Sequence, residues 1–466
     1  MKLLEGPSGN AYYIVCLSTR SIPSSLAIGC ASLLLCRAAA GADPVITAAL
    51  RDISPERIHE DVARLASFGT RSTISAQDSA SIAAGHGIGA AREWLKGEFE
   101  RYSRECGGCL SVSMDEYVQQ PAERIPHPTL ISNVYAVLRG DQPADATRYV
   151  VVSGHYDSRN ADILDGSGAA PGANDDASGT AVVLECARVL SHRHFPASVM
   201  FLAVAGEEQA LNGSAHFARR ARSEGWDIEA VLSNDIVGGD KSPQQDAHVV
   251  RVFSEGIPAV AGTEDLRRIR ALGGENDSPS RELARLVGDT AAAYEPGVMP
   301  LLIFRPDRYL RGGDHTSFNE QGYAAVRFSE YREGFEHQHQ SPHLEGDVEY
   351  GDLLKFVDFD YVANVARLNA AVLAVLATAP APPAHVELLT AKLEHPSTLR
   401  WGAVRRAARY EVLWRSTAAA DWQHVYDAGT STSATLEVSK DEAIFAVRAL
   451  DGAGHASLPV VPRPAR

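Results

Sequence analysis

The sequence has too little positive charge for a typical nucleic-acid-binding protein and lacks the long apolar stretches of a membrane-spanning protein. It carries 44 Lys and Arg against 59 Asp and Glu, a formal net charge of −15. Phosphate backbones are bound by basic faces, so this balance argues against a nucleic-acid partner while still allowing a local basic pocket. No apolar run approaches the roughly 20 residues that cross a bilayer. We therefore expect no nucleic-acid partner and no membrane span.

Cysteine is also scarce, with six in 466 residues. Cys106 and Cys109 form the only CxxC pair, so a four-thiolate zinc site cannot be completed. A redox pair, half of a zinc site and a small disulfide remain open, and in an exported protein a disulfide is favoured. Cys186 lies in an apolar helical pattern and is expected to be a buried thiol.

The longest apolar run, LAIGCASLLLC at residues 26–36, lies near the start of the chain. It follows a basic residue and precedes several alanines, the order found in secretory signals. We expect residues 1–42 to be a signal peptide cleaved near Ala40 or Ala42, which predicts a secreted or periplasmic protein. A buried helix and a lipoprotein site at Cys30 are the alternatives, the latter with little apolar sequence before it.

The remaining length and patterning indicate two domains. In residues 43–377, apolar strands alternate with helical patterns, which predicts an α/β fold with a mostly parallel central sheet flanked by helices. A Pro-rich linker at 378–385 follows. Residues 386–466 hold short alternating strands with turn signals, typical of a small all-β sandwich with Trp401 and Tyr410 in its core. The strand pattern of this last region resembles a fibronectin type III domain.

The elements expected in the larger domain are the strands 130–138, 149–153, 199–205, 230–234 and 324–328 and the helices 54–68, 90–102, 177–190, 212–224, 278–290 and 356–376. Ionisable residues cluster at the ends of these strands, where the sites of parallel sheets lie. His nitrogens and carboxylate oxygens are ligands that Zn²⁺ prefers, and a two-metal site needs a bridging carboxylate plus terminal ligands. The candidate ligands are His155, Asp175, Glu208, Asp235 and a later His.

Two further acids lie beside these candidates. Asp157 can orient the His155 imidazole from behind, and Glu207 can act as a general base. Taken singly, adjacent acids such as Glu207 and Glu208 are more often a helix cap or a solvated turn.

The stretches GHYDS, PGANDDASG, VAGEEQALNGS, SNDIVGG and GGDHTSF closely resemble the dizinc exopeptidases of the bacterial leucyl aminopeptidase and glutamate carboxypeptidase type, metallopeptidase family twenty-eight. The resemblance covers roughly residues 55–376. It implies two Zn²⁺ ions, a zinc exopeptidase-like fold and a peptide substrate. The roles it implies are His155 and Asp235 on one zinc, Glu208 and a late His on the other, Asp175 bridging, Glu207 as base and Asp157 behind His155.

The late His lies in a segment that departs from the family pattern. Family members have a Tyr-His-Thr/Ser sequence there, whereas residues 335–343 read FEHQHQSPH. Matching the second His of the family pattern selects His339, with His337 as the runner-up, and the missing Tyr puts a phenol oxyanion role in doubt. The family analogue of His315, in GGDHTSF, lines the pocket more often than it binds metal.

The resemblance implies hydrolysis of peptide bonds at a chain terminus by a zinc-activated hydroxide, with Glu207 as the base. Release of N-terminal residues is favoured over carboxypeptidase activity, because exported bacterial members are mostly aminopeptidases. The residues near the pocket by sequence leave both open, since an acid would bind an α-amine and a basic group a carboxylate. They are Asp314, Glu330, Arg305 and Arg332.

Two other functions remain as alternatives. A glutaminyl cyclase-type acyltransferase shares the fold with a single zinc, but the full ligand set favours hydrolysis. A non-catalytic binding protein is disfavoured by the intact Glu207. The C-terminal sandwich is compatible with contact to a polymeric substrate, to a surface or to the catalytic domain, or with a spacer role.

Overall fold

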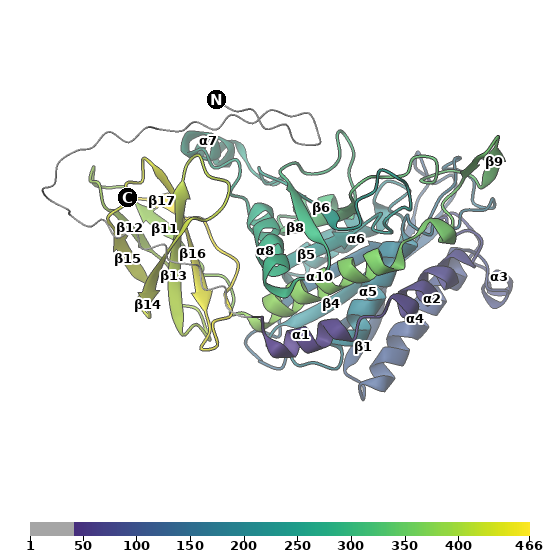
Figure 1. Ribbon diagram of the computed structural model, residues 1–466, viewed down its shortest axis with the longest axis horizontal. Helices are drawn as coiled ribbons and strands as arrows, with labels where there is room; N and C mark the ends of the chain where they lie inside the picture. Colours follow the sequence, from purple (N-terminus) through teal and green to yellow (C-terminus); the bar gives the residue numbers. More distant parts are fainter. Residues whose placement is uncertain (1–41) are drawn as a thin grey trace, which may run out of the picture. The chain divides into compact units, whose positions relative to one another are not determined.

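Residues 42–466, the part of the chain that the computed structural model describes, contain an eight-stranded mixed sheet in the order β1-β2-β4-β3-β5-β8-β6-β7 (Figure 1). The expected signal peptide lies almost wholly outside these residues. The strands are β1 (Leu110–Gln119), β2 (Thr129–Leu138), β3 (Arg148–His155), β4 (Ser198–Val204), β5 (Asp227–Asn234), β6 (Val249–Ser254), β7 (Met299–Ile303) and β8 (Ala325–Glu330). The central run β4-β3-β5-β8 is parallel, as expected, while β1, β2 and the β6–β8 pair add antiparallel contacts.

Helices cover both faces of this sheet (Figure 1). The helices of residues 42–466 are α1 (Pro44–Arg51), α2 (Pro55–Ala66), α3 (Ser79–Ala83), α4 (Gly87–Glu105), α5 (Ala177–Leu190), α6 (Asn212–Ser223), α7 (Thr263–Leu272), α8 (Pro279–Tyr294), α9 (Asp314–Asn319) and α10 (Phe359–Thr378). Of these, α3 packs on α4 and α7 has no buried residue, so neither lies on the sheet. A short hairpin, β9 (His343–Glu345) and β10 (Val348–Tyr350), and a 3₁₀ turn, Leu354–Phe356, precede α10. The α/β fold expected from the sequence is confirmed.

The alternation of β3 side chains explains why both faces are covered. Val150 and Val152 lie in the larger core with α5 and α10, whereas Val151 packs on the opposite face with Phe217 of α6 and Phe318 of α9. Successive strand residues point to opposite faces, so a strand buried on both sides reads as a continuous apolar run. Within the described residues, α10 alone has the length and apolar composition of a membrane span, but most of it is buried against α5, α8 and the sheet.

The sequence did not predict β1, β6, β7 or α7. β1 and β7 form the two edges of the sheet and leave many side chains partly exposed, so polar residues interrupt their apolar pattern. In α7 no residue is buried. The α5 prediction, in contrast, matches at both ends, because this helix is buried along its whole length.

The C-terminal region forms two facing sheets, β15-β12-β11-β17 and β14-β13-β16, as the sandwich prediction required. Their strands are β11 (Glu387–Leu389), β12 (Ser397–Arg400), β13 (Arg409–Ser416), β14 (His424–Gly429), β15 (Ser433–Leu436), β16 (Ala443–Leu450) and β17 (Arg463–Ala465). Leu399 and Trp401 pack against Tyr410 and Val412 of the other sheet. The predicted core positions of Trp401 and Tyr410 are confirmed.

Buried polar groups join this sandwich to the start of α8. Trp422 Nε1 donates to Glu282 Oε2 (2.8 Å), Arg415 forms an ion pair with Asp277, and Arg285 Nε donates to the Ala420 carbonyl (2.9 Å). Burial raises the pKa of Glu282 to about 7, although Arg285 opposes that shift. The contact therefore fixes charged groups away from water.

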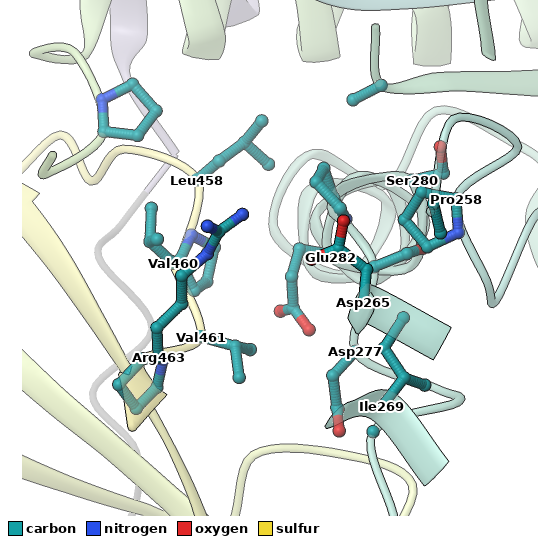
Figure 2. Close-up of a pocket in the computed structure, with 18 of the residues that line it drawn as sticks. Pro258, Asp265, Ile269, Asp277, Ser280, Glu282, Leu458, Val460, Val461 and Arg463 are labelled. Atoms are coloured by element: carbon teal, nitrogen blue, oxygen red, sulfur yellow. The ribbon is translucent and has the colours of Figure 1, made fainter. Parts of the chain in front are cut away.

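A cavity of about 720 Å³ lies beside this contact (Figure 2). Ile269 and Glu282 lie on one wall, facing Val460 and Val461 of the C-terminal region. Within the described part of the chain, neither group of candidate metal ligands lines it.

The cysteines follow the prediction. Cys106 and Cys109, just after α4, form a disulfide with an S–S distance of 2.00 Å. Cys186 is a buried free thiol in α5.

Candidate metal centre

The candidate ligands meet where the parallel strands end. His155 is the last residue of β3, Glu208 lies in the loop after β4, and Asp235 directly follows β5. Asp175 lies in the loop before α5, and His339 comes from the long loop after β8. The topology of the sheet thus gathers residues that are up to 184 positions apart, from His155 to His339.

Two groups of potential ligands form among the described residues. One contains His155, Glu207 and Asp235, and the other contains Asp175, Glu208 and His339; the ligand atoms of each lie within 4.8 Å of one another. Asp175 faces both groups. Its Oδ1 is 3.1 Å from His155 Nε2, and its Oδ2 is 2.9 Å from His339 Nε2. A carboxylate in this position can bridge two metal ions.

The outer contacts complete the two ligand groups. Asp235 Oδ1 is 3.8 Å from His155 Nε2, and Glu208 Oε1 is 3.2 Å from His339 Nε2. Every predicted ligand is therefore in the cluster.

The chemistry of the site fits a pair of cations. His155 Nε2, Asp175 Oδ1 and Glu208 Oε1 are buried and form no hydrogen bond within residues 42–466. Buried polar atoms normally have partners, and adjacent buried carboxylates need cations to offset their repulsion. With imidazole nitrogens and carboxylate oxygens as donors, the set suits Zn²⁺.

The protonation equilibria reflect this crowding. Burial raises the pKa of Glu207 well above its usual range, and the nearby Asp235 and Glu208 raise it further. Burial lowers the pKa of His339, but Glu208 and Asp175 outweigh it and raise that pKa to about 10. Zinc binds the neutral imidazole, so loading the site must release protons.

Asp157 connects both halves of the site. Its carbonyl lies 3.2 Å from His155 Nδ1 and its Oδ1 3.4 Å, so that Nδ1–H points back and Nε2 points into the site. Its carboxylate also accepts the backbone N–H groups of Glu207 (3.3 Å) and Glu208 (3.2 Å) and the Thr73 hydroxyl (3.0 Å). Asp157 thus orients the His155 imidazole, as expected from the sequence, and also holds the loop that carries Glu207 and Glu208.

Asp176 is a structural acid whose role the sequence did not predict. Its Oδ2 accepts the His155 backbone N–H (3.0 Å), and its Oδ1 accepts those of Gly179 (3.0 Å) and Ile236 (3.2 Å). It therefore ties together the loops that carry three ligands. Its adjacency to Asp175 was the signal that could have pointed to it.

Two distant residues also position ligands. Asp352 accepts the backbone N–H groups of Asn174 and Asp175, both at 2.7 Å. Arg327 of β8 is fully buried and lies 2.8 Å from Asp235 Oδ1. Nothing in the local sequence around either residue indicated this role.

The competing histidines lie elsewhere. His337 Nδ1 pairs with Asp240, and its ring stacks on Phe356 with 3.6 Å between centroids. His315 is fully buried with Nε2 2.8 Å from the Pro306 carbonyl, and it does not line the cavity above the ligands. Gln338 stands before His339 where the family has Tyr, and its amide donates to Asp175 Oδ2 (3.2 Å).

A cavity of about 690 Å³ opens over the ligands. The four residues that the sequence left open for specificity are not part of its lining: Asp314 and Glu330 are buried, and Arg305 and Arg332 are exposed outside it. The arginines that do line it among the described residues are Arg124, Arg159, Arg308 and Arg311.

Comparison with known proteins identifies relatives among zinc metalloproteases. Residues 133–348 match the model of peptidase family M28. A protein of Pyrenophora teres f. teres named "Probable zinc metalloprotease" is 44% identical over 431 residues, which cover 91% of this chain and 88% of that protein. A protein of Leptosphaeria maculans, also named a "Probable zinc metalloprotease", is 43% identical over 410 residues, covering 87% of this chain and 94% of its own length.

Two solved structures share the fold. The LapA aminopeptidase of Legionella pneumophila has a TM-score of 0.50 at 22% identity, covering 72% of each chain. LapB of the same organism has a TM-score of 0.50 at 19% identity, covering 71% of this chain and 74% of its own. At these identities the likeness concerns the fold alone, whereas the relatives above share sequence over most of their length. The chain belongs to peptidase family M28 and is a zinc metallopeptidase.

Proposed function

We propose that the protein is a dizinc exopeptidase that releases residues from the N-terminus of peptides. The observation that carries the two-metal assignment is the position of Asp175, with one carboxylate oxygen toward His155 and the other toward His339. His155 and Asp235 would hold one Zn²⁺, and Glu208 and His339 the other. A one-zinc acyltransferase would leave part of this ligand set without a purpose.

The ligand set also defines the chemistry. Bound zinc supplies a Lewis acid that polarises the scissile carbonyl and lowers the pKa of water. Glu207 lies beside His155 and Asp235, so its carboxylate is placed to take a proton from the attacking water and to pass it to the leaving amine. The hydrogen bond from its backbone to Asp157 keeps the side chain at this position.

Carboxypeptidase activity is the second candidate. The specific observation in its favour is the set of arginines in the cavity lining, since a C-terminal carboxylate needs a cation. In favour of the first candidate, LapA shares the fold and is described as an aminopeptidase.

We also propose export, and a fibronectin type III-like domain in residues 386–466 after the linker at 378–385. The Cys106–Cys109 disulfide supports an oxidising compartment. N-terminal sequencing of the mature protein tests this: a first residue near 41–43 is expected, and an intact Met1 would contradict export.

The test of the catalytic assignment is Glu207→Gln. Zinc content should stay at two per chain, while turnover of leucine amide should fall by about 10²- to 10⁴-fold, the usual contribution of a positioned proton-transfer group. Glu224→Gln, at the exposed end of α6, is the matched control. Wild-type turnover by the Glu207 variant would refute the base assignment, and one tightly held zinc per chain would favour the acyltransferase.

A further inference from the structure

Four arginines line the cavity over the ligands, in a protein that is acidic overall. The acids in its lining are Asp175, Glu207, Glu208 and Asp235, all members of the ligand and base set. Its four lining arginines contrast with a formal net charge of −15 for the chain. Among the described residues the lining thus offers no additional carboxylate for a substrate ammonium group.

Two of these arginines already form ion pairs with carboxylates of the protein. Arg308 and Arg311 each lie 3.0 Å from Glu333 Oε2, and Arg308 also contacts Asp307 Oδ1 at 3.0 Å. Both guanidinium groups are therefore held by ion pairs within the protein, with Glu333 shared with Arg251.

The other two have no such partner. Neither Arg124 nor Arg159 forms an ion pair with a carboxylate anywhere in residues 42–466. Arg124 Nη1 donates to the Glu208 carbonyl (3.1 Å), and Arg159 donates to the carbonyls of Asn160 (3.0 Å) and Ala161 (3.3 Å). Both guanidinium groups are thus held by neutral carbonyl oxygens, and no ion pair within residues 42–466 occupies them.

Both arginines are also attached to segments of the chain that carry metal ligands. Arg124, in the loop between β1 and β2, is attached to the residue that provides a metal ligand, and Arg159 follows His155 by four positions. A guanidinium has five N–H donors, so each arginine retains donors beyond those bonds. Planar, paired donors are suited to a carboxylate.

We propose that Arg124 and Arg159 bind a carboxylate of the peptide substrate and make the enzyme selective for anionic peptides. This inference rests on the proposed exopeptidase function. The carboxylate comes either from an acidic side chain next to the scissile bond or from the free C-terminus of a short peptide.

The experiment compares four peptides with the zinc-loaded enzyme: Leu-Gln-NH₂ with no carboxylate, Leu-Glu-NH₂ with a side-chain carboxylate, Leu-Gln with a terminal one, and Leu-Glu with both. Wild-type kcat/KM should be at least about 10-fold higher for a carboxylate peptide than for Leu-Gln-NH₂. Arg124→Ala and Arg159→Ala should each remove most of that preference and bring the ratio toward 1, mainly through KM, as expected for a lost charge-assisted hydrogen bond. The peptide whose ratio falls identifies the source of the carboxylate.

Controls separate this site from the metals, which also attract carboxylates. Arg305→Ala changes an exposed arginine that stacks on Tyr309 outside the cavity, and it should leave the ratio unchanged. Arg124→Lys keeps the charge without the paired donors and should retain part of the preference. A preference that survives both alanine variants, or an equal loss on all four peptides, would overturn the inference.

Binding measurements cover the case in which no peptide is hydrolysed. Calorimetric titration of Leu-Glu and of Leu-Gln-NH₂ into zinc-loaded Glu207→Gln protein should show tighter binding of Leu-Glu, and adding Arg124→Ala should remove most of the difference. Lack of turnover by the wild type would refute the proposed function. Equal binding of the two peptides would refute the carboxylate site separately.

Discussion

Replacing Asp157 by Asn removes one hydrogen-bond acceptor from the residue that contacts both the His155 imidazole and the loop carrying Glu207 and Glu208. Asp157 has two carboxylate oxygens that accept three donors, the backbone N–H groups of Glu207 and Glu208 and the Thr73 hydroxyl. Asn has one oxygen, and its NH₂ group must then face a donor. At least one buried N–H therefore loses its partner.

The expected cost follows from that count. A buried donor left without a partner costs about 1–3 kcal/mol. Removing one negative charge also reduces repulsion among the neighbouring acids, which offsets part of this loss. We therefore expect Asp157→Asn to lower the free energy of unfolding of the metal-free protein by an amount toward the lower end of about 1–3 kcal/mol and zinc affinity by about 10- to 100-fold.

Urea unfolding in the presence of chelator measures the first quantity, and competition with a chromophoric chelator measures the second. Thr73→Val is the matched control, because it removes one donor and leaves the carboxylate and both backbone contacts. It should cost about 1 kcal/mol and change zinc affinity little. An Asp157→Asn protein with wild-type unfolding free energy and wild-type zinc affinity would show that Asp157 does not organise the site.

Two further predictions concern the metal count and the contact between the domains. His339→Ala should reduce bound zinc from two ions to one per chain, as measured by elemental analysis. His337 pairs with Asp240 instead, so His337→Ala should retain both ions. Loss of zinc in the His337 variant would contradict the ligand assignment. Burial raises the pKa of Glu282 from 4.5 to about 7 in the folded protein, so this group's contribution to stability is present at acidic pH and lost as pH rises through 7. Glu282→Gln should therefore flatten the dependence of Tm on pH between 5 and 8. The corresponding change in the free energy of unfolding over this pH range is on the order of 2–3 kcal/mol. An unchanged slope would show that Glu282 does not titrate in this way.

The parts of the site that could be predicted were those encoded locally. His155 ends an apolar strand, Glu208 and Asp235 each follow one within a few residues, and the ends of parallel strands lie close together in the sheet. His339 was harder, because its loop lies outside the strand pattern and two other histidines share it. Resemblance to a family, rather than spacing, selected it.

Other residues act only through contacts that a local pattern does not contain. Arg327 reaches Asp235 from another strand, and Asp352 reaches the backbone of Asp175 from 177 residues away. Arg124 meets Glu208 through a loop with no periodicity to indicate its position. Edge strands such as β1 are difficult to predict for a related reason. One side of such a strand is partly exposed and gains little from apolar residues, so the apolar pattern of a strand is weak.

The polar contact at the start of α8 has a consequence for dissecting the protein. Cutting the chain at the Pro-rich linker would remove Arg415 and Trp422 together and leave Asp277 and Glu282 to share Arg285 on newly wetted surface. Such a fragment would lose activity through instability alone, so its failure would say nothing about what the C-terminal region recognises. Substitutions on the outward strands of the sandwich, which leave this contact intact, are the sound way to ask that question. The two regions should therefore be expressed and studied together as one protein.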